Sequence, residues 1–237
     1  MTVMILAAGR GKRMGELTEN TAKPLLMVAG RSLIAHHLAR LADAGFKNVV
    51  INIAYLAEQI IDALGDGSAY GLNIVYSDES SSGALETAGG IVHALELLES
   101  DPFIVINADI WTDYDFTALF RQPLSGLGHL VMVPNPAHNP DGDFTIGEGG
   151  SLFLHADEHQ QSNRLRTATF SGIAIYRKAF FNTLQQGKAA LAPLLAQAIQ
   201  ADQLSAELYE GQWSDIGTPE RLIELSSNLE RRADRAQ

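Results

Sequence analysis

The residues best suited to chemistry lie near the start of the chain, in the segment Gly9–Arg13, which reads GRGKR. This segment combines two glycines with three cations and contains no acidic residue. Because glycine has no Cβ, the backbone N–H groups of such a loop can approach an anion closely. Lys23, directly followed by Pro24, adds a further cation downstream. These residue types predict a loop that binds a polyanion such as a nucleoside triphosphate.

Three other interpretations of this loop are open. A dinucleotide-binding G-x-G-x-x-G fingerprint would need a third glycine at Met14 and a helix beginning there. A Walker A loop would need Ser or Thr at Arg13. A solvated surface turn would contain the same residues without a ligand. The apolar strand expected before the loop, Val3–Ala7, and the Lys23-Pro24 pair after it favour a binding loop.

Asp109 is the first candidate metal ligand. It follows the apolar run Phe103–Asn107, which is expected to be a buried strand. In open α/β sheets, ligands collect at the carboxyl ends of strands, and Mg²⁺ is commonly held there by one or two carboxylates together with phosphate oxygens. The alternative is that Asp109 only caps the next turn.

Other polar motifs are weaker indications of a functional site. Asp113-Tyr-Asp115 and Asp141-Gly-Asp143 both spell the D-x-D of metal-dependent glycosyltransferases, although Asp113 and Asp115 are better explained as caps of a helix near Phe116. Asp143 is a candidate sugar contact. The segment His155–His159 spells H-x-x-E-H, a zinc-protease motif that requires a helix. Its polar, turn-rich surroundings disfavour a zinc site. His36-His37 is interpreted as a surface or packing pair.

Composition limits the classes of function. The 237 residues carry a net charge of −11, which argues against nucleic acid as a partner. Residues 1–50 nevertheless contain seven of the 17 basic residues and only three of the 28 acidic ones, as expected for a local anion site. There is no cysteine, and no apolar run long enough to span a bilayer or to form a signal peptide. We therefore expect a cytoplasmic protein without a membrane partner.

The hydrophobic pattern predicts an α/β fold, a Rossmann-like, doubly wound mixed sheet that is mostly parallel. In the first half, strands and helices alternate. The expected strands are Val3–Ala7, Val49–Ile53, Asn73–Tyr76 and Phe103–Ile106, and the expected helices are Leu33–Leu41, Leu56–Leu64 and Thr87–Leu98.

After about Asp115 the pattern predicts an antiparallel extension of the same sheet. Its expected strands are His129–Val133, Phe144–Ile146, Ser151–Leu154 and Thr169–Tyr176. Leu204–Tyr209 is expected as a further strand, and Phe180–Ala201 and Pro219–Leu229 are expected as helices. No linker divides the chain. We therefore expect one domain over residues 1–237, with a nucleotide-binding half at about 1–115 and a sugar-binding half with closing helices at about 116–237.

The glycine-rich loop resembles the signature of the sugar-1-phosphate nucleotidyltransferases, G-x-G-x-R-hydrophobic with a downstream Lys-Pro. The resemblance extends over nearly the whole chain. Leu6–Gly9, Asn107–Asp113 and Trp213–Glu220 are most similar to the N-acetylmuramate 1-phosphate uridylyltransferases of that family, and next to the mannose-1-phosphate guanylyltransferases.

The resemblance implies a set of site residues. Asp109 and Asp215 would together bind Mg²⁺, and Arg13 and Lys23 would complete the catalytic group. The nucleotide would contact Ala7, Ala8, Gly9, Gly11, Lys12, Arg13, Lys23, Glu79 and Ala84. The base itself stays open, because a Glu79 carboxylate can accept a hydrogen bond from uracil or from guanine. The sugar would contact Asn107, Asn135, Asp143, Ser171 and Gly172.

The implied reaction condenses UTP with N-acetylmuramate 1-phosphate to UDP-N-acetylmuramate and pyrophosphate, in bacterial peptidoglycan recycling. The oligomeric state is not predicted. Alternatives are another hexose-1-phosphate nucleotidyltransferase such as a mannose-1-phosphate guanylyltransferase, a glycosyltransferase, and a nucleotide-sensing regulatory subunit. The chain departs from many relatives where they carry Glu-Lys-Pro with a lysine on the sugar phosphate. Either Lys23 and the metal suffice, or Arg164 or Arg166 substitutes; these arginines are also candidates for the lactyl carboxylate of a muramic sugar.

Overall fold

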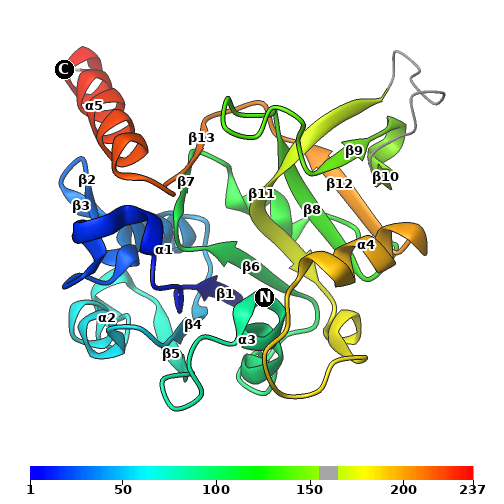
Figure 1. Ribbon diagram of the computed structural model, residues 1–237, viewed down its shortest axis with the longest axis horizontal. Coiled ribbons are helices and arrows are strands. Elements are labelled where there is room, and N and C mark those ends of the chain that lie inside the picture. The colour runs from blue at the N-terminus through cyan, green and yellow to red at the C-terminus, as the bar shows by residue number, and fades with distance from the viewer. Residues whose placement is uncertain (155–164, 237) are drawn as a thin grey trace.

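One sheet runs through both halves of the chain. The computed structural model describes residues 1–154 and 165–236, and within these ranges nine strands form a single sheet. Its parallel part has the order β6-β1-β4-β5, shown at the centre and lower left of Figure 1. These strands are β1 (Val3–Leu6), β4 (Asn48–Ile53), β5 (Asn73–Asp78) and β6 (Phe103–Asn107).

The second half extends this sheet. The long strand β11 (Arg166–Tyr176) pairs antiparallel with β6, so it joins the two parts. Strand β8 (Gly128–Val133) pairs antiparallel with β11, and β12 (Leu204–Leu208) pairs parallel with β8. The edge strands β9 (Phe144–Ile146) and β10 (Leu152–Phe153) follow β11. The expected mixed α/β sheet with an antiparallel extension is confirmed.

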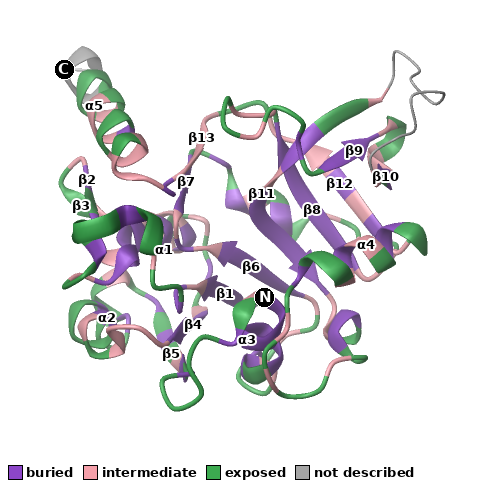
Figure 2. Ribbon diagram, in the orientation of Figure 1, coloured by how far each residue is buried: buried purple, intermediate pink, exposed green. Residues whose placement is uncertain are grey.

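Helices cover both faces of the sheet because successive side chains of a strand point to opposite faces. Val3 and Ile5 pack in one hydrophobic cluster with α1 (Leu33–Asp43) and α2 (Ala57–Leu64), whereas Met4 packs in another with α3 (Glu86–Ala94) and α4 (Ala192–Gln200). Figure 2 shows the buried strands between helices whose outer sides are exposed. Within the described ranges, no helix combines the length and apolar character needed to cross a bilayer.

Two short ribbons carry the connections that matter for the site. The strands β2 (Met27–Val28) and β3 (Arg31–Ser32) form a hairpin before α1. The strand β7 (Ile110–Thr112) pairs antiparallel with β13 (Trp213–Asp215), which leads into the C-terminal helix α5 (Pro219–Ala236). A third hydrophobic cluster, which includes Met14, Trp111 and Ile216, joins this ribbon to the N-terminal loop.

Two expectations about local structure are wrong. The segment 180–201 is not one helix: a 3₁₀ helix at Lys178–Phe181 is followed by an irregular segment, and α4 starts at Ala192 with Pro193 in its first turn. The intervening chain packs on α3, where the Gly89 N–H donates to the Ala189 carbonyl. Asp115 caps the 3₁₀ helix Phe116–Phe120 as expected, but Asp113 instead accepts hydrogen bonds from the Tyr209 hydroxyl and the Gln212 N–H.

Candidate active site

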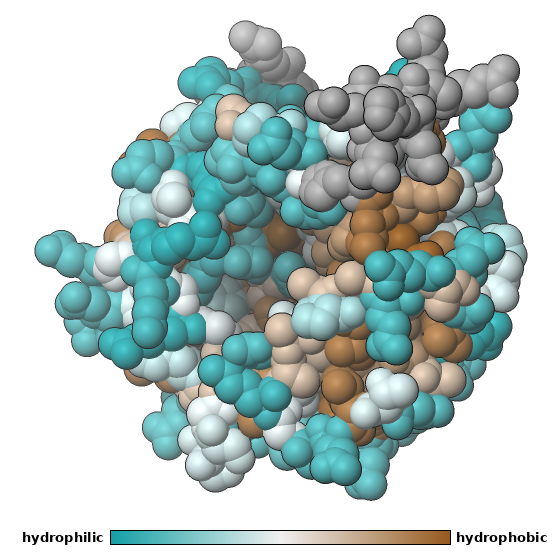
Figure 3. All heavy atoms as spheres, turned by 45° about the vertical axis from the view of Figure 1, so that its right-hand side comes forward, coloured by the Kyte–Doolittle hydropathy of each residue, from teal (hydrophilic) through white to brown (hydrophobic). Residues whose placement is uncertain are grey.

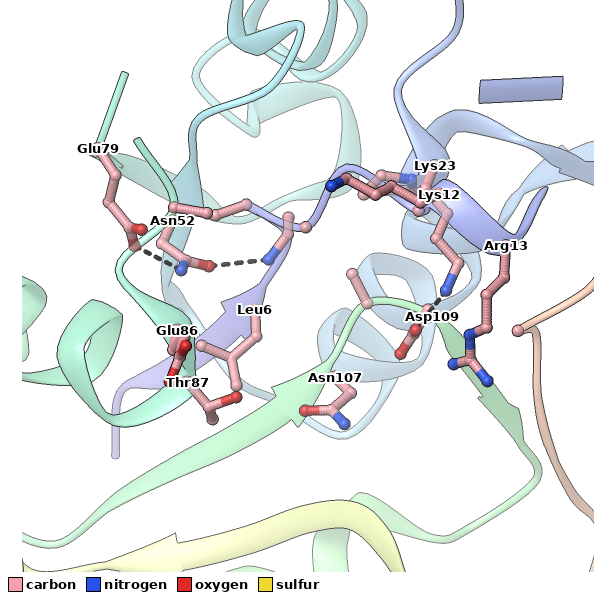
Figure 4. Close-up of a pocket in the computed structure, with 18 residues that line it drawn as sticks. Leu6, Lys12, Arg13, Lys23, Asn52, Glu79, Glu86, Thr87, Asn107 and Asp109 are labelled. Atoms are coloured by element: carbon pink, nitrogen blue, oxygen red, sulfur yellow. Dashed lines mark hydrogen bonds and ion pairs between the residues drawn. The ribbon is translucent and has the colours of Figure 1, made fainter. Parts of the chain in front are cut away.

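The cavity lined by the glycine-rich loop, hereafter the main cavity, lies at the carboxyl ends of three adjacent parallel strands. Leu6 is in register with Asn52 on β4 and with Asn107 on β6, and all three residues line the cavity. Its volume is about 410 Å³. Figure 3 shows a hollow near the centre of the molecular face, and Figure 4 shows the lining residues. The position is the one expected for a ligand in an open α/β sheet.

The glycine-rich loop forms one wall of this cavity. Gly9, Gly11, Lys12 and Arg13 all line it. Gly11 has φ +68°, and a Cβ at this position would lie 2.9 Å from Lys23 Cδ. Any other residue would therefore be strained and would displace Lys23, which packs beneath the loop with only 9% of its side chain exposed. Position 11 therefore requires glycine, because the loop turns sharply there and lies against a lysine.

Lys23 and Asp109 meet at one end of the cavity. The Lys23 ammonium donates to Asp109 Oδ2, and this ion pair joins the N-terminal loop to the end of β6. In Figure 4, Lys23 and Arg13 both extend toward the strand end that carries Asp109. The buried His37 supports the same corner, with its Nε2 2.8 Å from the Ile110 carbonyl. Burial lowers the pKa of His37 to about 4, so it is neutral near pH 7 and donates from Nε2. The packing interpretation of this histidine is confirmed.

The β7–β13 ribbon places the backbone of Asp215 next to that of Asp109, although Asp215 lines a second cavity and not the main one. Asp215 is in register with Ile110, and the Ile216 N–H donates to the Asp109 carbonyl at 2.7 Å. The backbones of two aspartates that are 106 residues apart in sequence are therefore neighbours. The Asp215 carboxylate accepts from Arg221 Nη1 at 2.6 and 2.7 Å and lies 2.8 Å from His138 Nε2.

The chemistry of these donors fits a hard divalent cation. Across the described residues there is no group of three or more His, Cys, Asp and Glu side chains arranged as metal ligands. Asp109 lines the main cavity and Asp215 lines a second cavity. Two carboxylates are nonetheless the donor set that Mg²⁺ usually takes from a protein, since phosphates and waters supply the remaining ligands. Both carboxylates are charge-compensated by the chain itself, Asp109 by Lys23 and Asp215 by Arg221.

A hydrogen-bonded relay forms the opposite end of the cavity. The Ala7 N–H donates to Asn52 Oδ1 at 2.8 Å, and Asn52 Nδ2 donates to Glu79 Oε1 at 2.7 Å (Figure 4). The other oxygen, Glu79 Oε2, accepts from the Leu85 N–H at 2.9 Å. Glu79 was expected to contact a base, but both of its oxygens are engaged inside the protein and only 1% of the residue is exposed. Its evident action is to position the loop that carries Ala84.

Glu86 and Thr87 also line this end, although neither is among the nucleotide contacts expected from the sequence. Glu86 has φ +62°, a left-handed conformation that favours glycine, and its carboxylate pairs with Lys188 at 3.2 Å. Five further residues line the cavity without having been expected from the sequence: Leu6, Pro24, Asn52, Ala108 and Gly217.

Two of the expected sugar contacts lie beside each other. Asn107 lines the cavity, and Gly172 on β11 has φ +82°. A Cβ on Gly172 would lie 2.6 Å from Asn107 Nδ2, so only glycine lets β11 approach this asparagine. Ser171 is buried at a bulge of β11, where its hydroxyl donates to the Val131 carbonyl at 2.6 Å.

The remaining sugar candidates, Asn135 and Asp143, do not line the cavity, and neither do Ser171 and Gly172. Asn135 donates to the Pro140 carbonyl and to Thr167 Oγ1, and Asp143 accepts from Asn139 Nδ2 and from the Phe170 N–H. These bonds shape the loop at 134–143. Arg166 is 70% exposed and pairs with Glu210 at 3.6 Å. The H-x-x-E-H segment, the position of the missing Glu-Lys-Pro motif and Arg164 lie outside the described residues.

A second cavity of about 810 Å³ adjoins the ribbon and α5. Its lining includes Trp111, His138, Trp213, Asp215 and Arg221. Sequence reasoning did not single out His138 or Arg221, because a lone histidine in a Pro-rich loop and an arginine in a helix have no local signal.

Comparison with known proteins agrees with this geometry. The nucleotidyl transferase family model matches residues 2–141. The chain belongs to the nucleotidyl transferase family. It is 51% identical over 233 residues to an N-acetylmuramate alpha-1-phosphate uridylyltransferase from Neisseria meningitidis, covering 96% of this chain and 97% of the relative. It is 31% identical over 232 residues to the protein of the same name from Caulobacter vibrioides, covering 95% and 96%.

The fold has solved counterparts. A crystal structure described as a putative glucose-1-phosphate thymidylyltransferase from Bacillus anthracis, in complex with a sucrose, superposes with a TM-score of 0.79. The superposition covers 96% of this chain and 95% of that one, at 17% identity, so it supports the fold alone. The family expected from the sequence is confirmed, and so is its enzymatic class, a sugar-1-phosphate nucleotidyltransferase.

Proposed function

We propose that this protein transfers the uridylyl group of UTP to N-acetylmuramate 1-phosphate, releasing pyrophosphate. The main support is the cavity that has a cationic glycine-rich loop with Lys23 and Asp109 at one end and the Glu79 relay at the other. A nucleoside triphosphate would place its phosphates at the first end and its base at the second. The choice of uridine and of the muramic sugar rests on the two relatives of that name.

The chain's own residues would act mainly by binding and alignment. The attacking group is a phosphate oxygen that is already an anion, so no general base is needed. The N–H groups of Gly9 and Gly11, with Lys12 and Arg13, would hold the β- and γ-phosphates and stabilise the departing pyrophosphate. Lys23 would lie at the α-phosphate and compensate the charge that develops there. Preorganised donors of this type are typically worth about 3–4 kcal/mol each in the barrier.

Asp109 and Asp215 would hold a divalent cation, Mg²⁺ in this proposal. Such an ion would reduce the repulsion between the two phosphate groups. Because Lys23 and Arg221 neutralise these carboxylates, both cations would become available to the phosphates once another positive charge takes their place.

The two halves of the chain would divide the binding task. Residues 1–115 would bind the nucleotide, with Ala7, Ala8 and Ala84 against the nucleoside and Glu79 positioning the base loop. Residues 116–237 would supply most of the sugar side within a single domain. The direct sugar contacts we propose are Gly172 from this half and Asn107 from the first half, and Ser171, Asn135 and Asp143 would shape the wall around them. We place the reaction in the cytoplasm, in the reuse of cell-wall sugars.

An assay matrix tests this function. The purified protein is incubated with Mg²⁺, four nucleoside triphosphates and a panel of hexose 1-phosphates, and pyrophosphate release is followed with a coupled pyrophosphatase. We expect the highest kcat/KM for UTP with N-acetylmuramate 1-phosphate. A preference for GTP with mannose 1-phosphate would instead identify a guanylyltransferase, and nucleotide binding without turnover on any sugar would favour a regulatory subunit.

A further inference from the structure

Arg221 is a cation of the active site that no sequence motif indicated. It lies in the first turn of α5, and only 17% of its side chain is exposed. One guanidinium nitrogen, Nη1, contacts both oxygens of Asp215 and lies 2.7 Å from His138 Nε2. The other terminal nitrogen, Nη2, has no hydrogen-bond partner in the described part of the chain.

This free nitrogen lies over Gly217, which lines the main cavity. A Cβ on Gly217 would be 2.2 Å from Arg221 Nη2 and 3.2 Å from Arg13 Nη2. The guanidinium groups of Arg13 and Arg221, which lie near opposite ends of the sequence, are therefore both close to Gly217. Among the side chains of residues 1–154 and 165–232, no carboxylate pairs with Arg13. Two neighbouring guanidinium groups with one compensating carboxylate leave an excess positive charge at this point.

We propose that Arg13 and Arg221 form a paired-guanidinium site over Gly217 that binds a phosphate group of the substrates. A guanidinium presents its N–H groups in a fixed fork that matches two phosphate oxygens, and a phosphate between two such groups removes their mutual repulsion. Arg166, which the sequence analysis named with Arg164 as a possible substitute for the missing lysine at the sugar phosphate, is exposed and paired with Glu210. The proposal rests on the proposed function for its substrates, which offer two sources of phosphate: the pyrophosphate part of the nucleotide and the sugar 1-phosphate.

The absence of a side chain at Gly217 leaves space for the Arg221 guanidinium next to Arg13. Its φ is not in the left-handed region, so alanine would be tolerated by the backbone. The added methyl group would occupy the place of Arg221 Nη2 and would push the guanidinium away from Arg13. Gly217→Ala therefore disturbs the phosphate site while Arg221 itself is retained.

Metal-free calorimetry tests the site without depending on turnover. Binding of pyrophosphate and of N-acetylglucosamine 1-phosphate is measured in EDTA for the wild type, Arg221→Gln, Gly217→Ala and Arg231→Gln. Arg231 is an exposed arginine of the same helix and serves as the control. Loss of a hydrogen bond to a charged group typically weakens binding about tenfold to a hundredfold. We expect that loss for Arg221→Gln and a loss in the same direction for Gly217→Ala, with Arg231→Gln unchanged.

The affected ligand identifies the source of the phosphate. A weaker pyrophosphate complex assigns the site to the nucleotide, and a weaker sugar phosphate complex assigns it to the second substrate. Unchanged affinity for both ligands would overturn the proposal, as would a wild type that binds neither.

A double variant separates direct contact from an effect through Asp215. Removing Arg221 alone leaves the Asp215 carboxylate uncompensated, and its charge would itself repel an anion. Arg221→Gln combined with Asp215→Asn removes both charges. We expect this double variant to bind the affected ligand as weakly as Arg221→Gln, and recovery of wild-type affinity would show that Arg221 acts only by neutralising Asp215, which would overturn the proposed direct contact. If Arg221→Gln fails to fold by circular dichroism, Gly217→Ala carries the test. Failure of the proposed function would appear separately, as absent turnover of the wild type in the assay matrix.

Discussion

Replacing Glu79 by glutamine should destabilise the protein, although the two side chains have the same shape. The Ala7 N–H must donate to Asn52 Oδ1, so the Asn52 amide cannot flip and its Nδ2 must donate toward Glu79. The Leu85 N–H donates to the other carboxylate oxygen. Both oxygens of residue 79 must therefore accept, and glutamine has only one acceptor. One buried donor will face the glutamine NH₂ group.

The size of the effect follows from burial. Glu79 is 1% exposed and Asn52 3%, so water cannot replace the lost partner. A hydrogen bond to a charged group contributes about 1.5–3 kcal/mol, and an unsatisfied buried donor costs about 1–3 kcal/mol. Because glutamine is less costly to bury than a carboxylate, we expect a net loss of about 3 kcal/mol in the free energy of unfolding. For a chain of this length that corresponds to a Tm lower by about 6–12 °C.

Differential scanning calorimetry and urea titration measure this change. Glu96→Gln is the matched control, because Glu96 is exposed and the substitution removes the same charge. A Tm for Glu79→Gln within about 1 °C of the control would refute the acceptor argument. A nucleotide titration of the folded variant would additionally report whether the relay positions the base loop.

Three further predictions concern the site and its support. Lys23→Met should lower kcat by about a hundredfold or more while circular dichroism stays unchanged; near-wild-type turnover would remove Lys23 from the mechanism. Gly172→Ala, which combines φ +82° with a close approach to Asn107, should lower the Tm and raise the KM for the sugar phosphate more than that for the nucleotide. Burial lowers the pKa of His37 from 6.5 to about 4, so below pH 6.5 the unfolded chain binds a proton at this residue more readily than the folded protein does. The free energy of unfolding should therefore decrease as the pH is lowered through this range, by about 2 kcal/mol at pH 5. Urea titrations at several pH values should show that His37→Gln loses this contribution to the pH dependence of stability. The same pH dependence in the variant and the wild type would contradict the assignment to His37.

Local patterns predicted most of the elements and one end of the cavity. The apolar runs at Val3, Val49 and Phe103 become the parallel strands because a strand buried on both faces is apolar throughout. The glycine-rich loop and Lys23 were also found from residue types alone, and they line the cavity together. Local patterns failed at 180–201, where packing against α3 outweighed helical periodicity.

By itself the sequence determined the strands of the nine-stranded sheet, the cationic loop and the family, because each is recorded in the types and spacing of neighbouring residues. Only the tertiary structure decided that Asp215 lies against Asp109, that Arg221 joins Arg13 over Gly217, and that Glu79 is bound inside the protein. These contacts depend on which strands pair and on where a distant helix begins. Such information belongs to the packing of the whole chain, since residues of separate elements share no local pattern from which their contact could be predicted.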